Sequence, residues 1–431
     1  MRRRISGIAV SMLMLIAAIS MASIAGLAKP DFMNKMMAGP SDDVAEWTIM
    51  VYLDGDNNLQ PDALNDLAEM EVVGSVGDVN VIVMMDTFDA IEGTHWYFIE
   101  AGSDHVNVEE GINACECEAI AGGCPGELNM GDPATLTHFL ETAVAYAPAD
   151  HYMLDLWDHG GGWWGVCYDD SSVSEIGYKD RLIMDEVANA VEASGVHLDI
   201  IGYDACFMGM VEIAYENRNI ADYMVASITT VPGLGWDYTG LLNSIQALDE
   251  KTAEAVSNST VDAYITSYEI CAGSGIAGYP YVSASVFDLS KVNDLAVYGI
   301  DPLAEALLDF ADDYYLRGAI ESSESRTPQL QFAGEQFPFV DIGWFVTLMA
   351  DKIPGLEALC DNTFALLDEA VVHVSSVTSD YGGVLDTYGM SIYFTCSWDK
   401  LYENYLTSNL DLVDDTLWDE FLFAFSMVYV E

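Results

Sequence analysis

The sequence predicts an α/β protein with a mostly parallel central sheet that helices cover on both faces. Over residues 47–228, short continuous apolar runs alternate with segments of helical periodicity. Continuous apolar runs are typical of strands that are buried on both faces, as in parallel sheets. The chain has 431 residues, of which 51% are hydrophobic, so it is long and apolar enough to bury a large core.

Six apolar runs are expected to be strands, and helical segments separate most of them. The predicted strands cover 47–53, 79–86, 95–101, 151–158, 198–204 and 222–228, and the predicted helices cover 59–75, 131–147, 180–194 and 207–219. Asp132 followed by Pro133 is a favourable start for the second helix, and Asp180 is expected to cap the third.

After residue 240 the chain becomes more helical. Helices are expected near 251–270, 301–320 and 355–376, and strands at 281–288 and 389–396. Residues 46–240 are therefore expected to form the α/β core, and residues 241–431 to form a helical C-terminal subdomain that completes it.

The N-terminus is expected to lie outside this fold. In residues 1–28, three arginines precede an apolar run that ends in small residues, as in a secretory signal. The run is long for a cleaved signal, so an uncleaved N-terminal membrane anchor is the alternative. Residues 29–45 are short, Met-rich and patternless, and are expected to be a flexible lead-in. The protein is thus predicted to be secreted or to lie at the extracellular surface.

The charge balance excludes some partners. The chain has 14 Lys and Arg against 70 Asp and Glu, a net charge of −56. Such a surface repels nucleic acid and anionic membranes, and it favours cations, basic peptides or high salt. We therefore expect no nucleic-acid partner and no membrane contact beyond the N-terminal segment. A solvated acidic coat explains most of these charges.

Eight cysteines are present, at positions 115, 117, 124, 167, 206, 271, 360 and 396. In an exported protein most of them are expected to be paired. Three lie in the Gly-rich segment "CECEAIAGGC", where a local disulfide is favoured over a metal site.

Two strand–helix units each deliver one reactive side chain to a strand end. His159 follows one predicted strand in "DHGGG", and Cys206 follows another in "YDACFMG". Ligands of open α/β sheets bind at the carboxyl ends of the strands. Amides at a helix N-terminus would lower the pKa of the Cys206 thiol, and the imidazole would act as base and then as acid. The N–H groups of Gly160 and Cys206 are expected to form an oxyanion hole. Taken singly, the histidine is typical of a turn and the cysteine of half a disulfide.

Several segments carry a family resemblance. They are "WTIMVYLDGDNNL", "ELNMGDPATL", "DLWDHGGGW", "GYDACFMGMVEIAYE", "VASITTVPGLGWDY" and "GMSIYF". In this order, from about Trp47 to the C-terminus, they resemble the clostripain family of cysteine endopeptidases, which has a caspase-like fold. The resemblance implies that residues 46–240 are the catalytic core. It also implies that His159 and Cys206 form a dyad that hydrolyses peptide bonds after basic residues.

Substrate selection is expected to depend on Asp204, two residues before the nucleophile. A carboxylate on the floor of the pocket would pair with Arg or Lys, and the alternative is that Asp204 caps the following helix. Trp236 lies in loop 229–238, which resembles the family's substrate-binding loop, and is expected to form a wall. Leu234 stands where the resemblance leads us to expect an acidic or polar residue. Whether the pocket has a second carboxylate is therefore left open, and Asp237 and Asp341 are the candidates.

Two further traits follow from the resemblance. Relatives often cut themselves at a basic residue between the histidine and the cysteine. Lys179 is the better candidate here because Arg181 falls in a predicted helix, although both also fit ordinary surface charges. The chemistry requires no cofactor, but calcium dependence occurs in the family. The acidic turn 54–58 offers oxygen ligands and lacks the rest of an EF-hand loop, so no metal ligands are assigned.

These observations predict a secreted cysteine endopeptidase that cleaves after Arg or Lys through a thioester acyl-enzyme. Two alternatives stay open. One is a catalytically silent extracellular binding or surface protein on the same scaffold, with Cys206 locked in a disulfide. The other is a related peptidase that prefers a different residue, such as Asn or Asp, before the scissile bond.

Overall fold

A computed structural model describes most of the chain after the N-terminal segment. The described residues are 44–88, 93–103, 112–113, 127–173, 179–273, 281–310, 317–320, 322, 329–332, 335–378, 387–394 and 403–427. The expected signal peptide and lead-in, and the segment "CECEAIAGGC", lie outside these residues.

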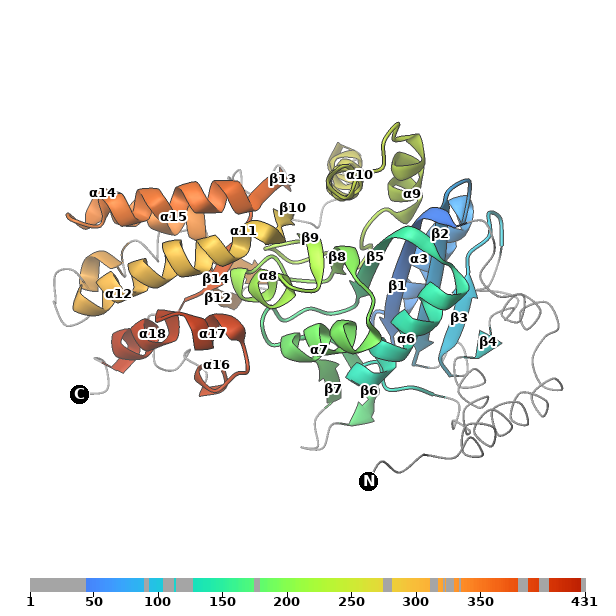
Figure 1. Ribbon diagram of the computed structural model, residues 1–431, viewed down its shortest axis with the longest axis horizontal. Helices are drawn as coiled ribbons and strands as arrows, with labels where there is room; N and C mark the ends of the chain where they lie inside the picture. Colours follow the sequence, from blue (N-terminus) through green and yellow to red (C-terminus); the bar gives the residue numbers. More distant parts are fainter. Residues whose placement is uncertain are drawn as a thin grey trace, which may run out of the picture.

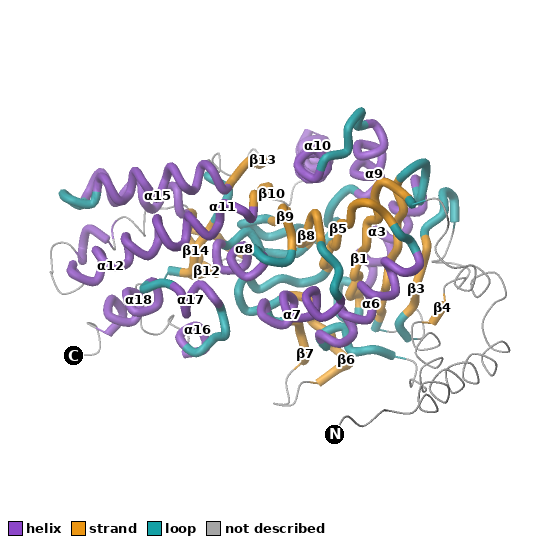
Figure 2. Tube along the Cα trace, in the orientation of Figure 1, coloured by secondary structure: helices purple, strands orange, loops and turns teal. Residues whose placement is uncertain are grey.

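A nine-stranded sheet forms the centre of the fold, in the order β13-β10-β9-β8-β5-β1-β2-β3-β4. Figures 1 and 2 show it with helices on both sides. Its strands are β1 (Ala45–Gly55), β2 (Val79–Thr87), β3 (His95–Phe98), β4 (Ile112–Asn113), β5 (Ala149–Trp157), β8 (Leu198–Asp204), β9 (Ala221–Ala226), β10 (Tyr281–Asp288) and β13 (Val371–Thr378). The six predicted strands up to residue 228 are all present, with small differences at their ends.

The sheet is parallel at its centre and antiparallel at both edges. Strands β9, β8, β5, β1 and β2 run parallel. Strand β10 pairs antiparallel with both β9 and β13, and β3 pairs antiparallel with both β2 and β4. The central strands are in register at their ends, since Leu53 pairs with Trp157 and Trp157 pairs with Asp204. The residues that follow β1, β5 and β8 therefore emerge side by side.

Two hydrophobic clusters cover the two faces of the sheet, as alternating strand residues point to opposite sides. On one face, α6 (Pro133–Tyr146), α7 (Met184–Ser194) and α8 (Val211–Asn217) pack against side chains such as Met50 and Leu154. On the other, α3 (Gln60–Val73), α9 (Tyr238–Ala247) and α10 (Ala253–Gly273) pack against side chains such as Ile49 and Met153.

The chain after residue 240 contributes to this sheet and also forms a helical layer beside it (Figure 1). Its further helices are α11 (Leu289–Asp294), a π-helix (Leu295–Ile300), α12 (Asp301–Phe310), α14 (Ile342–Lys352), α15 (Glu357–Ala370), α16 (Glu403–Leu406), α17 (Asp411–Asp415) and α18 (Trp418–Met427). A small antiparallel sheet joins β11 (Gln329–Phe332), β12 (Glu335–Asp341) and β14 (Ser391–Tyr393). Because β10 and β13 belong to the main sheet, the C-terminal part is continuous with the core.

One predicted helix begins later than expected. Residues Lys179–Leu182 form β7, which pairs with β6 (Val166–Val173), and the helix α7 starts only at Met184. Asp180 is therefore not its cap, and accepts a hydrogen bond from the Asn129 side chain instead. The start of α7 is satisfied by Glu186, whose carboxylate accepts from the N–H of Ile183.

The helix after Cys206 also begins later than predicted, at Val211. The N–H of Phe207 donates to the carbonyl of Thr229, and that of Gly209 donates to Ser227. The segment after β9 thus takes the backbone groups that a helix would have used. Near the C-terminus, the helix predicted to run to residue 376 ends at Ala370, because the β-branched run 371–378 pairs with β10 as β13.

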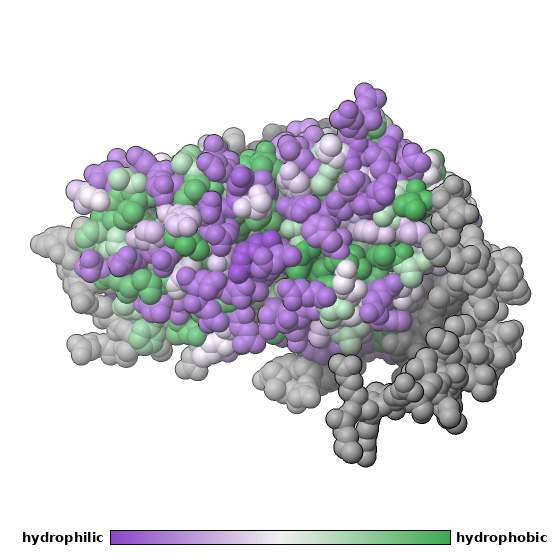
Figure 3. Space-filling model, viewed as in Figure 1, coloured by the Kyte–Doolittle hydropathy of each residue, from purple (hydrophilic) through white to green (hydrophobic). Residues whose placement is uncertain are grey.

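The surface is mainly hydrophilic on the face that Figure 3 shows, with apolar residues in small groups. No helix among the described residues combines the length and the apolar character that crossing a lipid bilayer requires. Three of the cysteines, Cys167, Cys206 and Cys360, are free thiols. The side chains of the other five are not among those that the structure describes, so the expectation that most cysteines are paired stays a prediction.

A buried carboxyl group joins the core to the C-terminal part. Glu212 of α8 accepts hydrogen bonds from the N–H of Tyr393, at 2.8 Å, and from the hydroxyl of Tyr405, at 3.1 Å. Its second oxygen has no hydrogen-bond partner among the described residues. Burial raises the pKa of Glu212 from 4.5 to about 7, although the two hydrogen bonds oppose this shift.

The raised pKa of Glu212 makes stability depend on pH. Below pH 4.5 the group is protonated in both the folded and the unfolded protein, so its contribution to stability is fully present. It is lost as the pH rises to about 7, because only the unfolded chain ionises freely in that interval. Glu212→Gln, which resembles the protonated acid, should raise the free energy of unfolding at pH 8 by about 1–3 kcal/mol. At pH 4 the variant should differ little from wild type. Urea titrations at the two pH values measure this, and an equal effect at both would contradict it.

Candidate active site

His159 and Cys206 leave adjacent parallel strands at the same edge of the sheet. Trp157 at the end of β5 pairs with Asp204 at the end of β8. Beyond this pair, the backbone segments that follow β5 and β8 come into close contact at Gly160. A Cβ atom on Gly160 would lie 2.3 Å from the carbonyl oxygen of Cys206 and 2.8 Å from its nitrogen. Only glycine allows this approach, so the first glycine of "DHGGG" is required for the two strand ends to meet.

Cys206 carries a half-buried free thiol. Its sulfur accepts a hydrogen bond from the N–H of Val231, at 3.3 Å, and donates to the carbonyl of Val231, at 3.5 Å. Burial raises the pKa of the thiol to about 11, and hydrogen bonds from the backbone of Val231 and Gly160 oppose the shift. The expectation that helix amides lower this pKa is wrong, because α8 begins five residues after Cys206 and its amides are not beside the sulfur.

His159 lies next to Cys206 in the fold but has a different partner. Its Nε2–H donates to Asn58 Oδ1 over 3.1 Å, so the imidazole is turned toward the loop after β1. Burial lowers the pKa of His159, and the carboxylate of Asp170 opposes this shift. The structure thus holds a neutral thiol and a neutral imidazole, each bound to its own neighbour.

The remaining residues of "DHGGGWW" pack against the C-terminal part. Gly162 has a φ of 62°, and a Cβ there would lie 2.7 Å from the sulfur of Met210 and 3.0 Å from the ring of Phe339, which belongs to the C-terminal part. The rings of Trp163 and Trp164 stack at 4.6 Å, and Trp163 also contacts Tyr405 edge-on at 5.0 Å. The glycine turn and the two tryptophans therefore fix the His159 loop to the helical layer.

Asp204 is buried at the end of β8, and its side chain accepts hydrogen bonds from the segment after β9. Its Oδ2 accepts hydrogen bonds from the N–H of Trp236, at 2.8 Å, and from the hydroxyl of Tyr238, at 3.2 Å. Its Oδ1 has no partner among the described residues. Burial raises the pKa of Asp204 well above its usual value, and the nearby Asp155 carboxylate raises it further. Asp204 does not cap α8, so the capping alternative is excluded.

A second buried carboxylate, Asp66 of α3, lies beside Asp204. A Cβ on Gly235 would lie 2.6 Å from Asp204 Oδ2 and 2.8 Å from Asp66 Oδ2, so both oxygens border the same point. Asp66 accepts a hydrogen bond from the Trp157 indole at 2.7 Å. Burial, followed by repulsion from Asp204, raises its pKa to about 10.

Asp66 was not predicted as a site residue from the sequence, although its position carries a signal. Asp66 occupies the same helical face as Ala63 and Met70, where a charged residue is unexpected unless it has a function or a partner. The two residues suggested for a second pocket carboxylate lie elsewhere. Asp237 caps α9 by accepting from the N–H of Gly240, and Asp341 caps α14 by accepting from the N–H of Trp344.

Trp236 is buried against the sheet, whereas Lys179 lies at the surface. The Trp236 indole is buried and packs on β8, where a Cβ on Gly202 would lie 2.8 Å from it. Its backbone N–H, rather than its ring, is bound to Asp204. Lys179 begins β7 and pairs with Asp170, and 60% of its side chain is exposed. Arg181 also lies on β7 and not in a helix, with its Nε bound to the carbonyl of Trp164.

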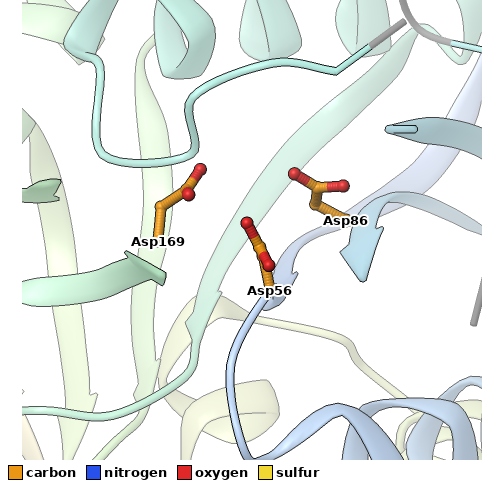
Figure 4. A group of neighbouring side chains, drawn as sticks. All are labelled: Asp56, Asp86 and Asp169. Atoms are coloured by element: carbon orange, nitrogen blue, oxygen red, sulfur yellow. The ribbon is translucent and has the colours of Figure 1, made fainter. Parts of the chain in front are cut away.

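One group of carboxylates could hold a metal ion. Asp56, Asp86 and Asp169 are buried, and one ligand oxygen of each lies within 4.8 Å of the other two. Figure 4 shows the three side chains facing a common space between β1, β2 and β6. Asp56 belongs to the acidic turn 54–58, while Asp86 and Asp169 come from distant parts of the sequence.

Comparisons with known proteins agree with this arrangement. Residues 51–425 match the model of the clostripain family. Clostripain from Hathewaya histolytica is 32% identical over 226 residues, which cover 46% of this chain and 42% of that protein. The match therefore spans less than half the length of this curated relative.

Two solved structures share the fold. One is a secreted C11 cysteine protease from Bacteroides thetaiotaomicron in complex with an irreversible peptide inhibitor, with a TM-score of 0.62 and 22% identity. The other is an inactive zymogen C11 protease from Parabacteroides distasonis, with a TM-score of 0.61 and 20% identity. Each match covers 87% of this chain, and covers 100% and 99% of the other chains. The predicted caspase-like α/β fold is thus confirmed, and because the family model matches nearly the whole described chain, this protein belongs to the clostripain family of cysteine endopeptidases.

Proposed function

We propose that this protein is an exported cysteine endopeptidase that cleaves peptide bonds after Arg or Lys, with His159 and Cys206 as its catalytic residues. One observation carries the proposal. A free, partly accessible thiol lies against the backbone of Gly160, next to an imidazole, at the carboxyl edge of a parallel sheet. Because Cys206 is a free thiol, the alternative of a silent protein with this cysteine locked in a disulfide has no support.

The reaction begins with proton transfer from the Cys206 thiol to His159. The sulfur then forms a bond to the carbonyl carbon of the substrate, and the N–H groups of Gly160 and Cys206 stabilise the negative oxygen. His159 gives its proton to the departing amine as the C–N bond breaks, which leaves a thioester. Water, deprotonated by the same imidazole, then adds to the thioester. The tetrahedral intermediate that results breaks its C–S bond, which releases the carboxylic acid, and the imidazolium returns its proton to the sulfur and restores the thiol.

The protonation states of Cys206 and His159 before substrate binds suit this order of steps. A thiol with a pKa of about 11 is neutral at pH 7, and so is an imidazole whose pKa is lowered by burial. The ion pair therefore forms only when a substrate is bound and His159 turns from Asn58 toward the sulfur. A protected, neutral thiol is also less exposed to oxidation outside the cell.

The preference for basic residues is assigned to Asp204 and Asp66. Burial is the main cause of the raised pKa of both carboxyl groups, and repulsion from Asp204 raises the pKa of Asp66 further. A guanidinium or ammonium group of the substrate would relieve the repulsion, whereas a neutral side chain would not. The net charge of −56 would also attract cationic substrates.

Export and maturation rest on the sequence. The basic and apolar residues 1–28 support secretion or retention at the extracellular surface. Lys179 is the proposed site of self-cleavage, since its side chain is largely exposed on β7, between the two catalytic residues in the sequence. No nucleic-acid partner is proposed for so acidic a chain.

The assignment of the nucleophile predicts a clear difference between cysteines. Cys206→Ala and His159→Ala should each lower kcat/KM on arginyl peptide substrates by at least ~10³-fold, because nucleophile and base act as one unit. Cys360→Ala is the matched control, since it also removes a free thiol, and it should keep near-wild-type activity. An arginyl chloromethylketone should label Cys206 alone, as mass spectrometry of the digested protein would show. Full activity of Cys206→Ala would exclude the proposal.

The assignment of the two carboxylates predicts a change in selectivity. Asp204→Asn should lower kcat/KM for arginyl and lysyl substrates by about 100-fold, and Asp66→Asn by about 10-fold, because each removes one partner of the cation. Peptides with a neutral residue before the scissile bond should be affected far less. Asp237→Asn, outside this pair, is the control and should keep the wild-type ratio. A panel of fluorogenic peptides that differ only at this residue measures the ratio, and preferred cleavage after Asn or Asp would refute the assignment.

A further inference from the structure

Asp155 and Tyr238 form a buried hydrogen-bonded group next to the Asp204 carboxylate. Asp155 lies in β5, Asp204 ends the neighbouring strand β8, and Tyr238 begins α9. Asp155 and Tyr238 are each 1% exposed, and Asp204 is 3% exposed. The Tyr238 hydroxyl lies 2.6 Å from Asp155 Oδ2 and 3.2 Å from Asp204 Oδ2, so it bridges the two carboxylates.

Asp155 holds both of its neighbours. Its Oδ1 accepts from the backbone N–H of Asp204 at 3.2 Å, and its Oδ2 accepts from the Tyr238 hydroxyl. The backbone N–H of Tyr238 donates to Glu69 Oε2 at 3.2 Å, which ties the start of α9 to α3. The Tyr238 side chain is therefore fixed both at its backbone and at its hydroxyl.

The hydrogen bonds to the Asp204 side chain reach only one of its oxygens in the described part of the chain. The N–H of Trp236, at 2.8 Å, and the Tyr238 hydroxyl both donate to Oδ2. Oδ1 is buried and has no hydrogen-bond partner among the described residues. A buried carboxylate oxygen without a donor is costly, so a donor that arrives from outside the chain is favoured at Oδ1.

We propose that Tyr238 is a positioning residue for substrate selection, which leaves Asp204 Oδ1 free for the basic side chain of the substrate and is itself held by Asp155. The proposal rests on the proposed function, because it concerns the pocket assigned to Arg or Lys. Hydrogen bonds to Oδ2 fix the orientation of the carboxylate, and a guanidinium or ammonium group can then donate to Oδ1. Tyr238 acts through Asp204 and makes no contact with the substrate.

The hydroxyl has one hydrogen to share between two carboxylates. The shorter distance, to Asp155, indicates that Asp155 takes the larger share. Burial is the main cause that raises the pKa of Asp204, the charge of Asp155 raises it further, and the hydrogen bonds from Trp236 and Tyr238 oppose the rise. Asp155 and the Tyr238 hydroxyl therefore act on the ionisation of Asp204 in opposite directions.

The other ionisable groups near Asp204 are acids. They are Asp66 and Glu69 of α3, Tyr264 of α10 and the Cys206 thiol. None of the ion pairs in the described part of the chain brings a lysine or arginine to Asp204 or Asp155. Burial, these acids and the two donors at Oδ2 therefore decide when Asp204 is ionised.

The test measures kcat/KM from about pH 5 to about pH 9 on two fluorogenic peptides, one with Arg and one with a neutral residue before the scissile bond. The ratio of the two values cancels the titration of Cys206 and His159, which both peptides need. Tyr238→Phe should lower this ratio about tenfold at pH 7, chiefly through a higher KM for the arginyl peptide. Because the lost donor favoured ionised Asp204, the ratio should begin to fall on acidification at a higher pH than in wild type.

Asp155→Asn should move the pH dependence of the same ratio the other way. The amide oxygen can still accept from the N–H of Asp204, and the amide nitrogen donates to the Tyr238 oxygen, so the hydroxyl hydrogen goes to Asp204. Loss of the Asp155 charge also favours ionised Asp204. The ratio should therefore persist to a lower pH than in wild type. If Tyr238→Phe does not fold, this shift by itself decides the inference.

Tyr203→Phe is the matched control. It also removes a buried tyrosine hydroxyl, one residue from Asp204 in the sequence, but this hydroxyl accepts from the Asn217 side chain at 2.7 Å, on the opposite face of the sheet. The ratio and its pH dependence should equal those of wild type.

Three results would overturn the inference. They are a wild-type ratio at every pH in folded Tyr238→Phe, an equal loss of activity of this variant on both peptides, and an Asp155→Asn ratio that stays unchanged or falls at a higher pH. Each of them leaves the proposed function standing when wild type cleaves the arginyl peptide. Absence of that cleavage in wild type would refute the proposed function itself, and the inference with it.

Discussion

The structure depends on how it accommodates aspartates that are buried at the carboxyl edge of its parallel strands. β1 ends beside Asp54 and Asp56, β2 near Asp86, and β8 at Asp204, and in-register parallel pairing brings these ends to one edge. No described lysine or arginine pairs with any of these side chains. Backbone amides and hydroxyl groups donate to some of their oxygens, and several other oxygens have no hydrogen-bond partner among the described residues. Such an edge is stabilised when cations arrive from outside the chain.

A cation from outside the chain would fulfil this need beside the proposed catalytic residues. On one side, Asp66 and Asp204 border a point next to Gly235, where the basic side chain of a substrate is proposed to bind. On the other side, the buried carboxylates of Asp56, Asp86 and Asp169 lie close together. The loop that carries Asn58 connects the second group to His159. The acidic residues at this edge thus have a proposed role in binding a cation, whereas most of the other acidic residues are expected to be solvated at the surface.

The His159 loop is fixed by packing as well as by charge. Gly162 allows close contact with Met210, and the stacked Trp163 and Trp164 rings pack against aromatic residues of the C-terminal part. Glu212 joins the same two parts through Tyr393 and Tyr405. The C-terminal residues therefore support the edge that carries His159 directly, and β10 and β13 extend the main sheet.

The sequence by itself determined the strands of the central sheet, because continuous apolar runs are a local signal. It also singled out His159, Gly160 and Cys206 as candidates, because they follow those runs directly. It could not place Asp66 beside Asp204, or Asp86 and Asp169 beside Asp56, since these pairs come from elements far apart in the chain. Local patterns also misplaced Asp180 and the start of α8. In both places the backbone pairs with a distant segment, β6 or the residues after β9, and such long-range hydrogen bonds override helical propensity. The protonation of Cys206 was likewise decided only by burial in the tertiary structure.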